Sequence, residues 1–405
     1  MRPGSRTSMQ EPARPPRKRL LRAAQVVGLL MALAASLVLV DAWFALGKAP
    51  DGERRARMEA SPQWIGSGFE NAIPMWNDIP GMMMSWREMS PHAEADFDFP
   101  VVKHDKSHLA QPPVSGLRVT WLGHSTVLIE MDGLRFLTDP IFGGRAAPLD
   151  WIGPKTWYPP PIPLDELENI DAVLISHDHY DHLQTETIVA LKDRDSKFVV
   201  PLGVGAHLEY WGVAADKIVE LDWWDRAHIG AVELVMTPAR HASGRQVFDQ
   251  RRTLWASYAL LGSTHRAYFG GDTGLFDELA DIGKALGPFD VTMFEVGAYS
   301  RYWPDWHLGP ENAVRAHELV RGDLLLPIHW GLLNLAPHGW TEPAERVLLE
   351  ARRRGVRALL PKPGEPFEPG AAPSTRKWWP QLPWQTVAEH SVDPTGLKPE
   401  TLRVP

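Results

Sequence analysis

The sequence of 405 residues contains no cysteine. Disulfides are therefore excluded, and any metal site must use histidine, carboxylate and water as ligands. The sequence also has no surplus of basic residues, because its net charge is −8. This argues against nucleic acid as the main partner, since phosphate binding needs a basic surface. The sequence shows no internal repeats and no low-complexity tracts.

The composition is that of a globular protein. Hydrophobic residues make up 44% and charged residues 23% of the chain, which is enough for a sizeable core in one large domain or two ordinary ones. We expect a basic segment, an apolar segment, a lead-in rich in Pro, Met and Trp, a central domain, and a tail rich in Pro and Trp that wraps the surface. These are residues 1–22, 23–47, 48–115, 116–365 and 366–405, in that order.

One apolar run stands out near the start of the chain. Residues 23–40, "AAQVVGLLMALAASLVLV", carry no charge and follow a basic block. Their length is at the lower limit for crossing a hydrocarbon layer of ~30 Å and exceeds the ~7–15 residues usual for the core of a signal peptide. We therefore expect a transmembrane anchor, with a cleaved signal peptide or a buried core helix as alternatives. The distribution of Lys and Arg predicts a periplasmic or otherwise extracytoplasmic catalytic domain, or a secreted one if the segment is cleaved.

Two readings are open for residues 73–86, "IPMWNDIPGMMMSW". The stretch is either a loop packed over the domain or an apolar surface that contacts lipid.

Between residues 116 and 365, short apolar runs alternate with helical patterns. Runs such as 172–176 and 324–330 predict strands. Residues 310–321 predict a helix with proline at its first position, and residues 342–355 predict a helix closed by glycine. The mixture predicts an α+β fold of two sheets covered outside by helices.

The stretch "HDHYDH" at residues 177–182 directly follows a predicted strand. His177 and His179 are two positions apart and can face one spot, while Asp181 and His182 can face a second spot a few ångströms away. Two centres served by one loop predict a dinuclear metal site. Imidazole and carboxylate suit zinc, and also manganese or iron. We expect Asp178 to point to solvent.

Further ligands are expected at other strand ends. His241, Asp272 and His329 each follow an apolar run. A single histidine in such a place is more often a hydrogen-bonded core residue, but the cluster at 177–182 favours a ligand role for all three. Asp139 is either a carboxylate that orients a ligand histidine or a turn residue before proline, and His124 is a candidate to line the site.

The order His-x-His-x-Asp-His, followed by His, Asp and His at strand ends, resembles the metallo-β-lactamase superfamily. That resemblance implies an αββα sandwich of two mixed sheets flanked by helices. The motifs "LRVTWLGHSTVLIEMDGLRFLTDPIF", "IDAVLISHDHYDHL", "GDTG", "GAY" and "IHWG" are together similar to the N-acyl-phosphatidylethanolamine-hydrolysing phospholipase D family. That family cleaves its lipid into phosphatidic acid and an N-acylethanolamine with two zinc ions.

The resemblance also implies roles for individual residues. It assigns His177, His179 and His241 to the first zinc, Asp181, His182 and His329 to the second, and Asp272 to the bridge between them. It makes Asp181, Asp272 and His307 catalytic, with His307 at the substrate phosphate, and it places Asp139, His124 and Tyr299 behind the ligands or in the substrate pocket. The sequence departs from the family at Trp306, where a polar residue is expected, and at Glu295, where a neutral residue is more usual.

We therefore expect a phosphodiesterase that uses a metal-bridged hydroxide and has a lipid substrate and the membrane as partners. A homodimer is a further expectation. The alternatives are a lactonase of the ascorbate-6-phosphate type with manganese, another small-ester hydrolase, or a membrane-anchored metal-binding protein without activity. A nuclease of the same superfamily is disfavoured by the charge of −8.

Overall fold

The computed structural model describes residues 17–246 and 248–398. The chain divides into two compact units, of which the first ends at Ala45 and the second begins at Leu46. The second unit contains the predicted lead-in, the central domain and the described part of the tail. Most of the predicted basic segment 1–22 lies outside the described residues.

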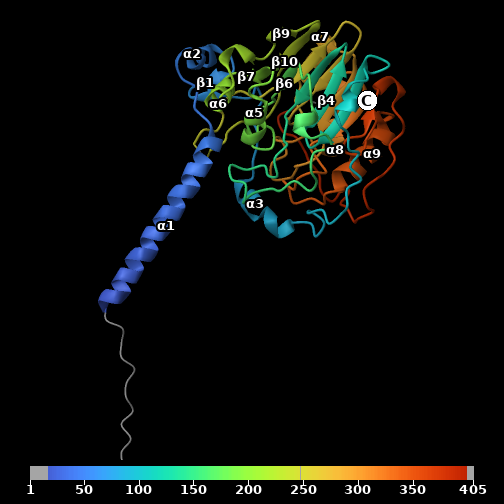
Figure 1. The fold of residues 1–405 in the computed structure, drawn as a ribbon. Coiled ribbons are helices and arrows are strands. Elements are labelled where there is room, and N and C mark those ends of the chain that lie inside the picture. The colour runs from blue at the N-terminus through green and yellow to red at the C-terminus, as the bar shows by residue number, and fades with distance from the viewer. Residues whose placement is uncertain (1–16, 247, 399–405) are drawn as a thin grey trace, which may run out of the picture. The chain divides into compact units, whose positions relative to one another are not determined.

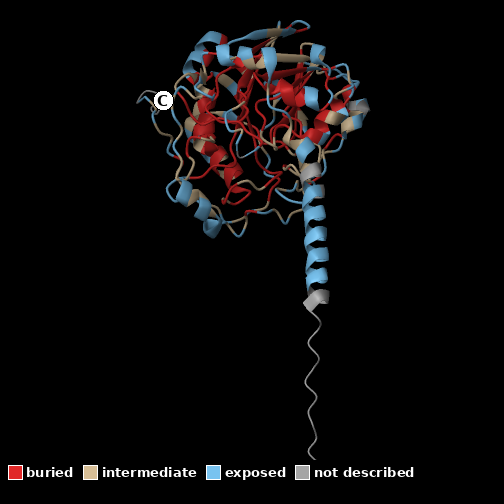
Figure 2. Ribbon diagram, turned by 90° about the vertical axis from the view of Figure 1, so that its left-hand side faces the viewer, coloured by how far each residue is buried: buried red, intermediate tan, exposed pale blue. Residues whose placement is uncertain are grey.

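The described part of the N-terminal unit is the helix α1 (Arg17–Leu46), whose last residue belongs to the second unit. Most of its described apolar side chains are exposed, among them Leu29 and Met31, and Figure 2 shows most of the helix in the colour of exposed residues. Among the residues that the structure describes, no helix is both long enough and apolar enough to cross a membrane. The predicted transmembrane anchor is therefore not confirmed. Several side chains of the run 23–40 (positions 37, 39 and 40) lie outside the described part of the structure.

Within the described residues, the second unit has two large sheets of seven strands each. The first has the order β16-β3-β4-β5-β6-β7-β8 and the second the order β15-β14-β13-β12-β11-β10-β9. In each sheet one half is antiparallel and the other half, β5 to β8 or β12 to β15, is parallel. The strands of the first sheet are β3 (Leu117–Gly123), β4 (Thr126–Met131), β5 (Leu134–Thr138), β6 (Ala172–Leu174), β7 (Lys197–Pro201), β8 (Ile218–Leu221) and β16 (Pro366–Phe367). Those of the second are β9 (Arg226–Ile229), β10 (Val232–Thr237), β11 (Ser257–Leu261), β12 (Arg266–Phe269), β13 (Phe289–Glu295), β14 (Gly322–Ile328) and β15 (Arg357–Ala358).

The alternation of side chains along the strands builds the layers. In β6, Ala172 and Leu174 belong to the core between the sheets, whereas Val173 packs on the outer face with Ile188 and Leu208. That outer face is covered by α5 (Thr185–Leu191) and α6 (Gly205–Tyr210). The helices α7 (Leu279–Leu286), α8 (Gly309–Leu319) and α9 (Glu342–Arg354) pack on the second sheet. The predicted αββα sandwich is confirmed, and Figure 1 shows α5 and α6 on the opposite side of the sheets from α8 and α9.

The two helices predicted from residues 310–321 and 342–355 correspond to α8 and α9. Each has a proline in its first turn. Gly355 closes α9 with a φ of 71°, in the left-handed region that glycine adopts without strain.

The predicted lead-in and tail contribute to the same compact unit as the sheets. The lead-in forms α2 (Gly52–Ala60), β1 (Trp64–Ile65), β2 (Gly68–Phe69), α3 (Ile79–Met84) and α4 (Lys106–Leu109). After β16, which pairs with β3, the tail buries Trp378 and Trp379 in the main core. The tail is therefore part of the packing and more than a surface wrap.

One edge of the sandwich collects the ends of many strands. The parallel halves place the carboxyl ends of β5, β6, β12, β13 and β14 together. β3 and β10 run in the same direction as β5 and β12, from which one antiparallel strand separates each of them. The predicted site residues follow these strand ends, because loops at such an edge can aim side chains at a common point.

Candidate metal centre

Three histidines form the first half of the centre. His177 and His179 lie in the loop after β6, and His241 lies in the loop after β10. His177 Nε2 is 2.8 Å from His179 Nδ1, and His241 Nε2 is 3.4 Å from the same atom. One nitrogen from each ring lies within 4.8 Å of the other two. The three nitrogens are therefore close enough together to hold one ion.

A second group lies beside the first. His182 Nε2 and His329 Nε2 are each 3.3 Å from Asp181 Oδ2. Asp272 Oδ2 is 3.1 Å from His182 Nε2, 3.2 Å from His329 Nε2 and 3.8 Å from His241 Nε2. Asp272 thus lies between the two groups, and the structure brings all seven predicted ligands together.

The chemistry of these groups fits divalent cations. His182 Nε2 and Asp272 Oδ1 are buried without a hydrogen-bond partner. Burial holds the pKa of His177 and of His241 well below the usual value.

At His182 and His329 burial also acts to lower the pKa, but Asp272 and Asp181 hold that of His182 well above the usual value and raise that of His329 to about 10. A divalent cation would take the place of the protons on these two rings. Burial alone would raise the pKa of Asp272, but His182 and His329 hold it well below its usual range. Neutral imidazole and charged carboxylate are the forms that bind a metal.

The backbone is unusual at three of these strand ends. His124, Asp139 and His329 have φ values of 51°, 33° and 62°, in the left-handed region that non-glycine residues rarely adopt. Such strain is found where a site over-determines the local conformation. Gly271, next to Asp272, also has a positive φ, and a Cβ there would lie 2.6 Å from Ser176 Cβ. The loop of Asp272 can approach the loop of His177 only because glycine is there.

Asp139 supports the ligands from behind. It lies 2.7 Å from His182 Nδ1 through Oδ2, and it accepts hydrogen bonds from the amide and the hydroxyl of Ser176 at 2.7 and 2.5 Å. The Ser176 hydroxyl is in turn 2.9 Å from His177 Nδ1. A carboxylate that holds the distal nitrogen of a ligand histidine fixes its ring and tautomer. Ser176 is a residue that the sequence analysis missed, and no local signal distinguishes it.

His124 and Tyr299 have different surroundings. His124 Nε2 lies 2.9 Å from Asp181 Oδ2, and its ring centroid lies 3.9 Å from that of His329. Tyr299 is turned away: its hydroxyl donates to Glu342 at 2.6 Å, and its ring stacks on His338. Tyr299 does not line either pocket described below, but it lies behind His338, which lines the first of them.

Asp178 does not point to solvent, which corrects the expectation from the sequence. It is buried and accepts hydrogen bonds from the Gly244 amide and the Thr253 hydroxyl, both at 2.7 Å. Arg245 donates to the carbonyls of Asp178 and Leu183 at 2.8 and 2.7 Å. These contacts connect the loop of residues 177–182 with the segment after β10. They also provide the hydrogen bonds that the buried charge of Asp178 requires.

His307 lies at the edge of the centre. Its Nδ1 is 2.5 Å from Glu295 Oε2 and 3.7 Å from Asp272 Oδ2. The preceding residue, Trp306, stacks its ring over His179 at an interplanar angle of 5°, and its carbonyl lies 2.9 Å from His241 Nδ1. A tryptophan in place of the expected polar residue thus covers the first group of histidines.

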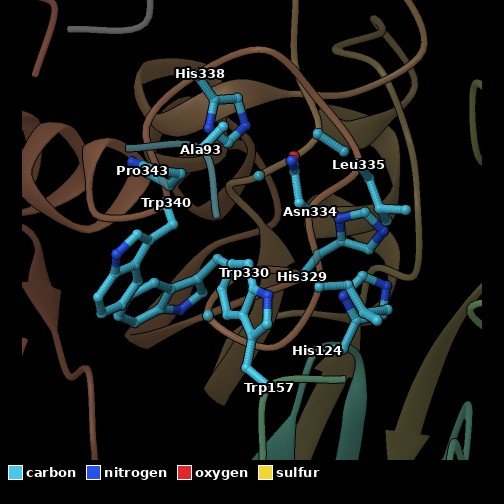
Figure 3. Close-up of a pocket in the computed structure, with 14 residues that line it drawn as sticks. Ala93, His124, Trp157, His329, Trp330, Asn334, Leu335, His338, Trp340 and Pro343 are labelled. Carbon is cyan, nitrogen blue, oxygen red and sulfur yellow. The ribbon is translucent and has the colours of Figure 1, made fainter. Parts of the chain in front are cut away.

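Two pockets flank the centre. The first borders His124 and His329, has both apolar and polar side chains in its lining, and has a volume of about 20 Å³. Figure 3 shows the rings of three tryptophans on one side of this pocket and the two histidines on the other. Its remaining lining includes Trp157, Trp330, Leu333, Asn334, Leu335, His338 and Trp340. The second pocket lies beside Trp306 and is lined partly by polar residues, among them Asn71, Asn77 and Arg251.

Comparisons with known proteins agree with this geometry. Residues 134–330 match the family described as "Beta-lactamase superfamily domain". The chain is 44% identical over 338 residues to an uncharacterized protein of Mycobacterium tuberculosis, covering 80% of this chain and 89% of the relative. It is 35% identical over 318 residues to N-acyl-phosphatidylethanolamine-hydrolyzing phospholipase D 1 of Caenorhabditis elegans, covering 72% and 89%. Among solved structures, a possible metal-dependent hydrolase from Veillonella parvula aligns with a TM-score of 0.50 at 14% identity, covering 62% of this chain and 98% of that one.

Proposed function

The chain belongs to the N-acyl-phosphatidylethanolamine-hydrolysing phospholipase D family within the metallo-β-lactamase superfamily, and from that membership we propose that this metal-dependent hydrolase cleaves a lipid phosphodiester. N-acyl-phosphatidylethanolamine is the substrate that we favour. One observation carries the proposal: seven ligand-type residues meet at one edge of the sandwich, and the lead-in that borders the pocket beside Trp306 exposes large apolar side chains such as Met83 and Trp86. A phosphodiester with an apolar substituent has both parts that this arrangement fits.

Two zinc ions are the metals that we propose, with manganese or iron as alternatives. His177, His179 and His241 would hold the first, Asp181, His182 and His329 the second, and Asp272 would bind both. Such ions supply an activated water and neutralise the charge that grows on the phosphate oxygens.

The protein's own groups prepare this site. Asp139 fixes the ring of His182. His124 Nε2 lies 2.9 Å from Asp181 Oδ2, the same oxygen that His182 and His329 approach. His307, whose Nδ1 bonds to Glu295, is placed to contact a phosphate oxygen with its other nitrogen. The Trp306 ring lies parallel to that of His179, with 6.4 Å between the two centroids.

The pocket beside His124 and His329 has a volume of about 20 Å³, which is room for about one water molecule. An acyl chain would therefore stay outside it, against the exposed apolar side chains of the lead-in, where each CH₂ removed from water contributes ~0.8 kcal/mol. Asn334 and His338 are polar side chains of the lining and offer hydrogen-bond partners to an amide or a headgroup.

Residues 74–93 run between the two pockets. Pro74 lines the pocket beside Trp306 and accepts a hydrogen bond from Arg240 at 2.7 Å, and Ala93 lines the apolar pocket. Between them lie large exposed apolar side chains: Trp76, Ile79, Met83, Met84, Trp86 and Met89. Of the two readings of this stretch, we favour a surface that contacts the lipid bilayer while its backbone packs on the domain.

This proposal predicts a difference between two substrates. Replacing Met83, Met84 and Trp86 together by serine should lower the rate on lipid vesicles by about tenfold or more, since these side chains would lose their apolar contact with the bilayer. The rate on a short soluble phosphodiester should stay within about twofold, and replacing the exposed Val114 and Val387 by serine serves as the control. An equal loss on both substrates would show that the stretch has only a structural role.

A lipid substrate also leads us to propose that the protein works at a membrane, with its catalytic domain on the periplasmic or extracytoplasmic side. Release as a secreted protein is the alternative. A reporter at the C-terminus that is active only in the cytoplasm would contradict both locations.

The main experiment is a screen of the purified, zinc-loaded protein against lipid phosphodiesters, sugar-phosphate lactones and β-lactams. Release of phosphatidic acid from N-acyl-phosphatidylethanolamine is the expected result. Rapid lactone opening without phosphodiester cleavage would replace the proposal with a lactonase. Two bound metals without turnover of any substrate would favour a metal-binding protein.

A further inference from the structure

Glu295 ends β13 at the carboxyl edge of the sheet, where it is completely buried. None of the seven proposed ligand positions includes it. A buried carboxylate is costly unless its oxygens are hydrogen-bonded. The partners of this carboxylate therefore indicate what it does.

The two oxygens of Glu295 bond to two different loops. Oε1 accepts hydrogen bonds from the amide of Thr273 at 2.7 Å and from the amide of Leu308 at 3.4 Å. Oε2 lies 2.5 Å from His307 Nδ1. One side chain thus connects the residue after the bridging Asp272 with His307 and its neighbour.

The ring of His307 depends on this contact. The backbone before it is held by other groups, since Asp305 pairs with Arg240 at 2.9 Å and the Trp306 carbonyl lies 2.9 Å from His241 Nδ1. These contacts fix the path of the loop but not the rotation of the His307 side chain. Among the described residues, Nδ1 bonds to Glu295 and no hydrogen bond from the protein to Nε2 is present.

We propose that Glu295 is a positioning residue, which holds His307 so that Nε2 faces a phosphate group bound next to Asp272. The inference rests on the proposed function, because it assigns the phosphate to that place. The ring is 13% exposed and lies beside the centre, so Nε2 can reach a bound ligand. A carboxylate suits this task because it has two oxygens. One accepts the hydrogen bond from the Thr273 amide, and the other bonds to the ring of His307.

Two other roles would give different results. Glu295, Asp272, His307 and His329 have atoms close enough to hold an ion, so Glu295 would be a ligand if its replacement released metal. It would be merely structural if its replacement changed stability but nothing at the phosphate.

The test replaces Glu295 by glutamine in the full chain. Glutamine has nearly the same shape but only one acceptor oxygen, so it cannot serve Thr273 and His307 as the carboxylate does. We expect two metal equivalents to remain bound, while the affinity for inorganic phosphate, measured by calorimetry on the zinc-loaded protein, falls by about 10- to 100-fold. The kcat on a soluble phosphodiester should fall by a similar factor. Glu130→Gln is the matched control, because Glu130 is also buried but pairs with Arg118; it should alter the melting temperature without altering phosphate affinity.

A double-mutant cycle shows whether Glu295 acts through His307. In a His307→Gln background, Glu295→Gln should change phosphate affinity by less than about threefold, because the group that it positions is gone. Additive effects of the two substitutions would overturn the inference, as would loss of a metal equivalent or an unchanged phosphate affinity in Glu295→Gln. If the coupling is found but no lipid phosphodiester is cleaved, the proposed function fails while the positioning role stands.

Discussion

The middle of the two sheets and their carboxyl edge are equally buried but differ in what they bury. In the middle, positions such as Phe136 and Leu174 are completely enclosed and apolar. At the edge, His182, His241 and Asp272 are enclosed just as fully, although each carries polar atoms that water would otherwise solvate. The middle is stabilised by removing apolar surface from water, whereas the edge needs hydrogen bonds and cations to compensate for lost hydration.

The largest expected effect concerns Asp272, which lies between the two groups of ligands. Asp272→Asn should release at least one metal equivalent and lower turnover by about 100-fold or more, because a neutral amide bridges two cations poorly. Elemental analysis of the purified variant measures the first effect. Asp323→Asn, at an exposed carboxylate, is the control, and full metal occupancy in Asp272→Asn would contradict the assignment of the bridge.

The second prediction concerns the apolar core in the middle of the two sheets. Phe136→Ala should lower the free energy of unfolding by ~3–5 kcal/mol, because it leaves a cavity in a close-packed core. Denaturant unfolding measures this change. The folded fraction should keep its full metal content, and Phe136→Leu should cost less. A variant that keeps its stability but loses metal would show that the two regions are not separate.

Asp139 offers a finer test of how the edge is supported. Asp139→Asn should weaken metal affinity by about 10- to 100-fold, since the asparagine no longer holds His182 with a charged oxygen. Competition with a chelator of known affinity measures it. Asp132→Asn is the matched control, because Asp132 bonds His265 at 2.8 Å in a similar pair away from the centre. Equal losses of metal affinity in Asp139→Asn and Asp132→Asn would show that Asp139 has no particular role in supporting the centre.

The smallest effect on the metal centre at neutral pH is expected for a substitution at Glu342, a buried carboxylate whose partners are protein groups. Burial works against its charge, but contacts with His390, His338 and Tyr299 lower its pKa to about 2. This folded-state pKa lies below the value of about 4.3 expected for glutamate in the unfolded chain. The stabilisation of the folded protein by the Glu342 carboxylate is therefore complete above about pH 4.3 and is lost as the pH falls towards 2. The difference in melting temperature between the wild type and Glu342→Gln should shrink in that window. Metal content at pH 7 should not differ, and a loss of metal in Glu342→Gln would show that this network also supports the centre.

Much of the fold can be predicted from local patterns in the sequence. The alternation along β6 and the proline and glycine boundaries of α9 depend on neighbours in the chain, so the sandwich and several element limits were predictable. The set of candidate ligand residues could be proposed for a related reason. Four of them lie in the stretch 177–182, and the others come one to four residues after apolar strands.

The sequence by itself determined the order of strands and helices, the apolar layers and the set of ligand-type residues, because these depend on periodicity and on residue types at strand ends. The tertiary structure decided what surrounds those ligands. Asp178 is buried because Gly244 and Thr253, which are 66 and 75 positions away, bond to it, and Tyr299 is turned from the pocket by its bond to Glu342. Glu295 meets His307 only because the chain turns back beside β13. Hydrogen bonds between distant segments leave no periodic trace, since they depend on where the loops are brought by the packing of the sheets.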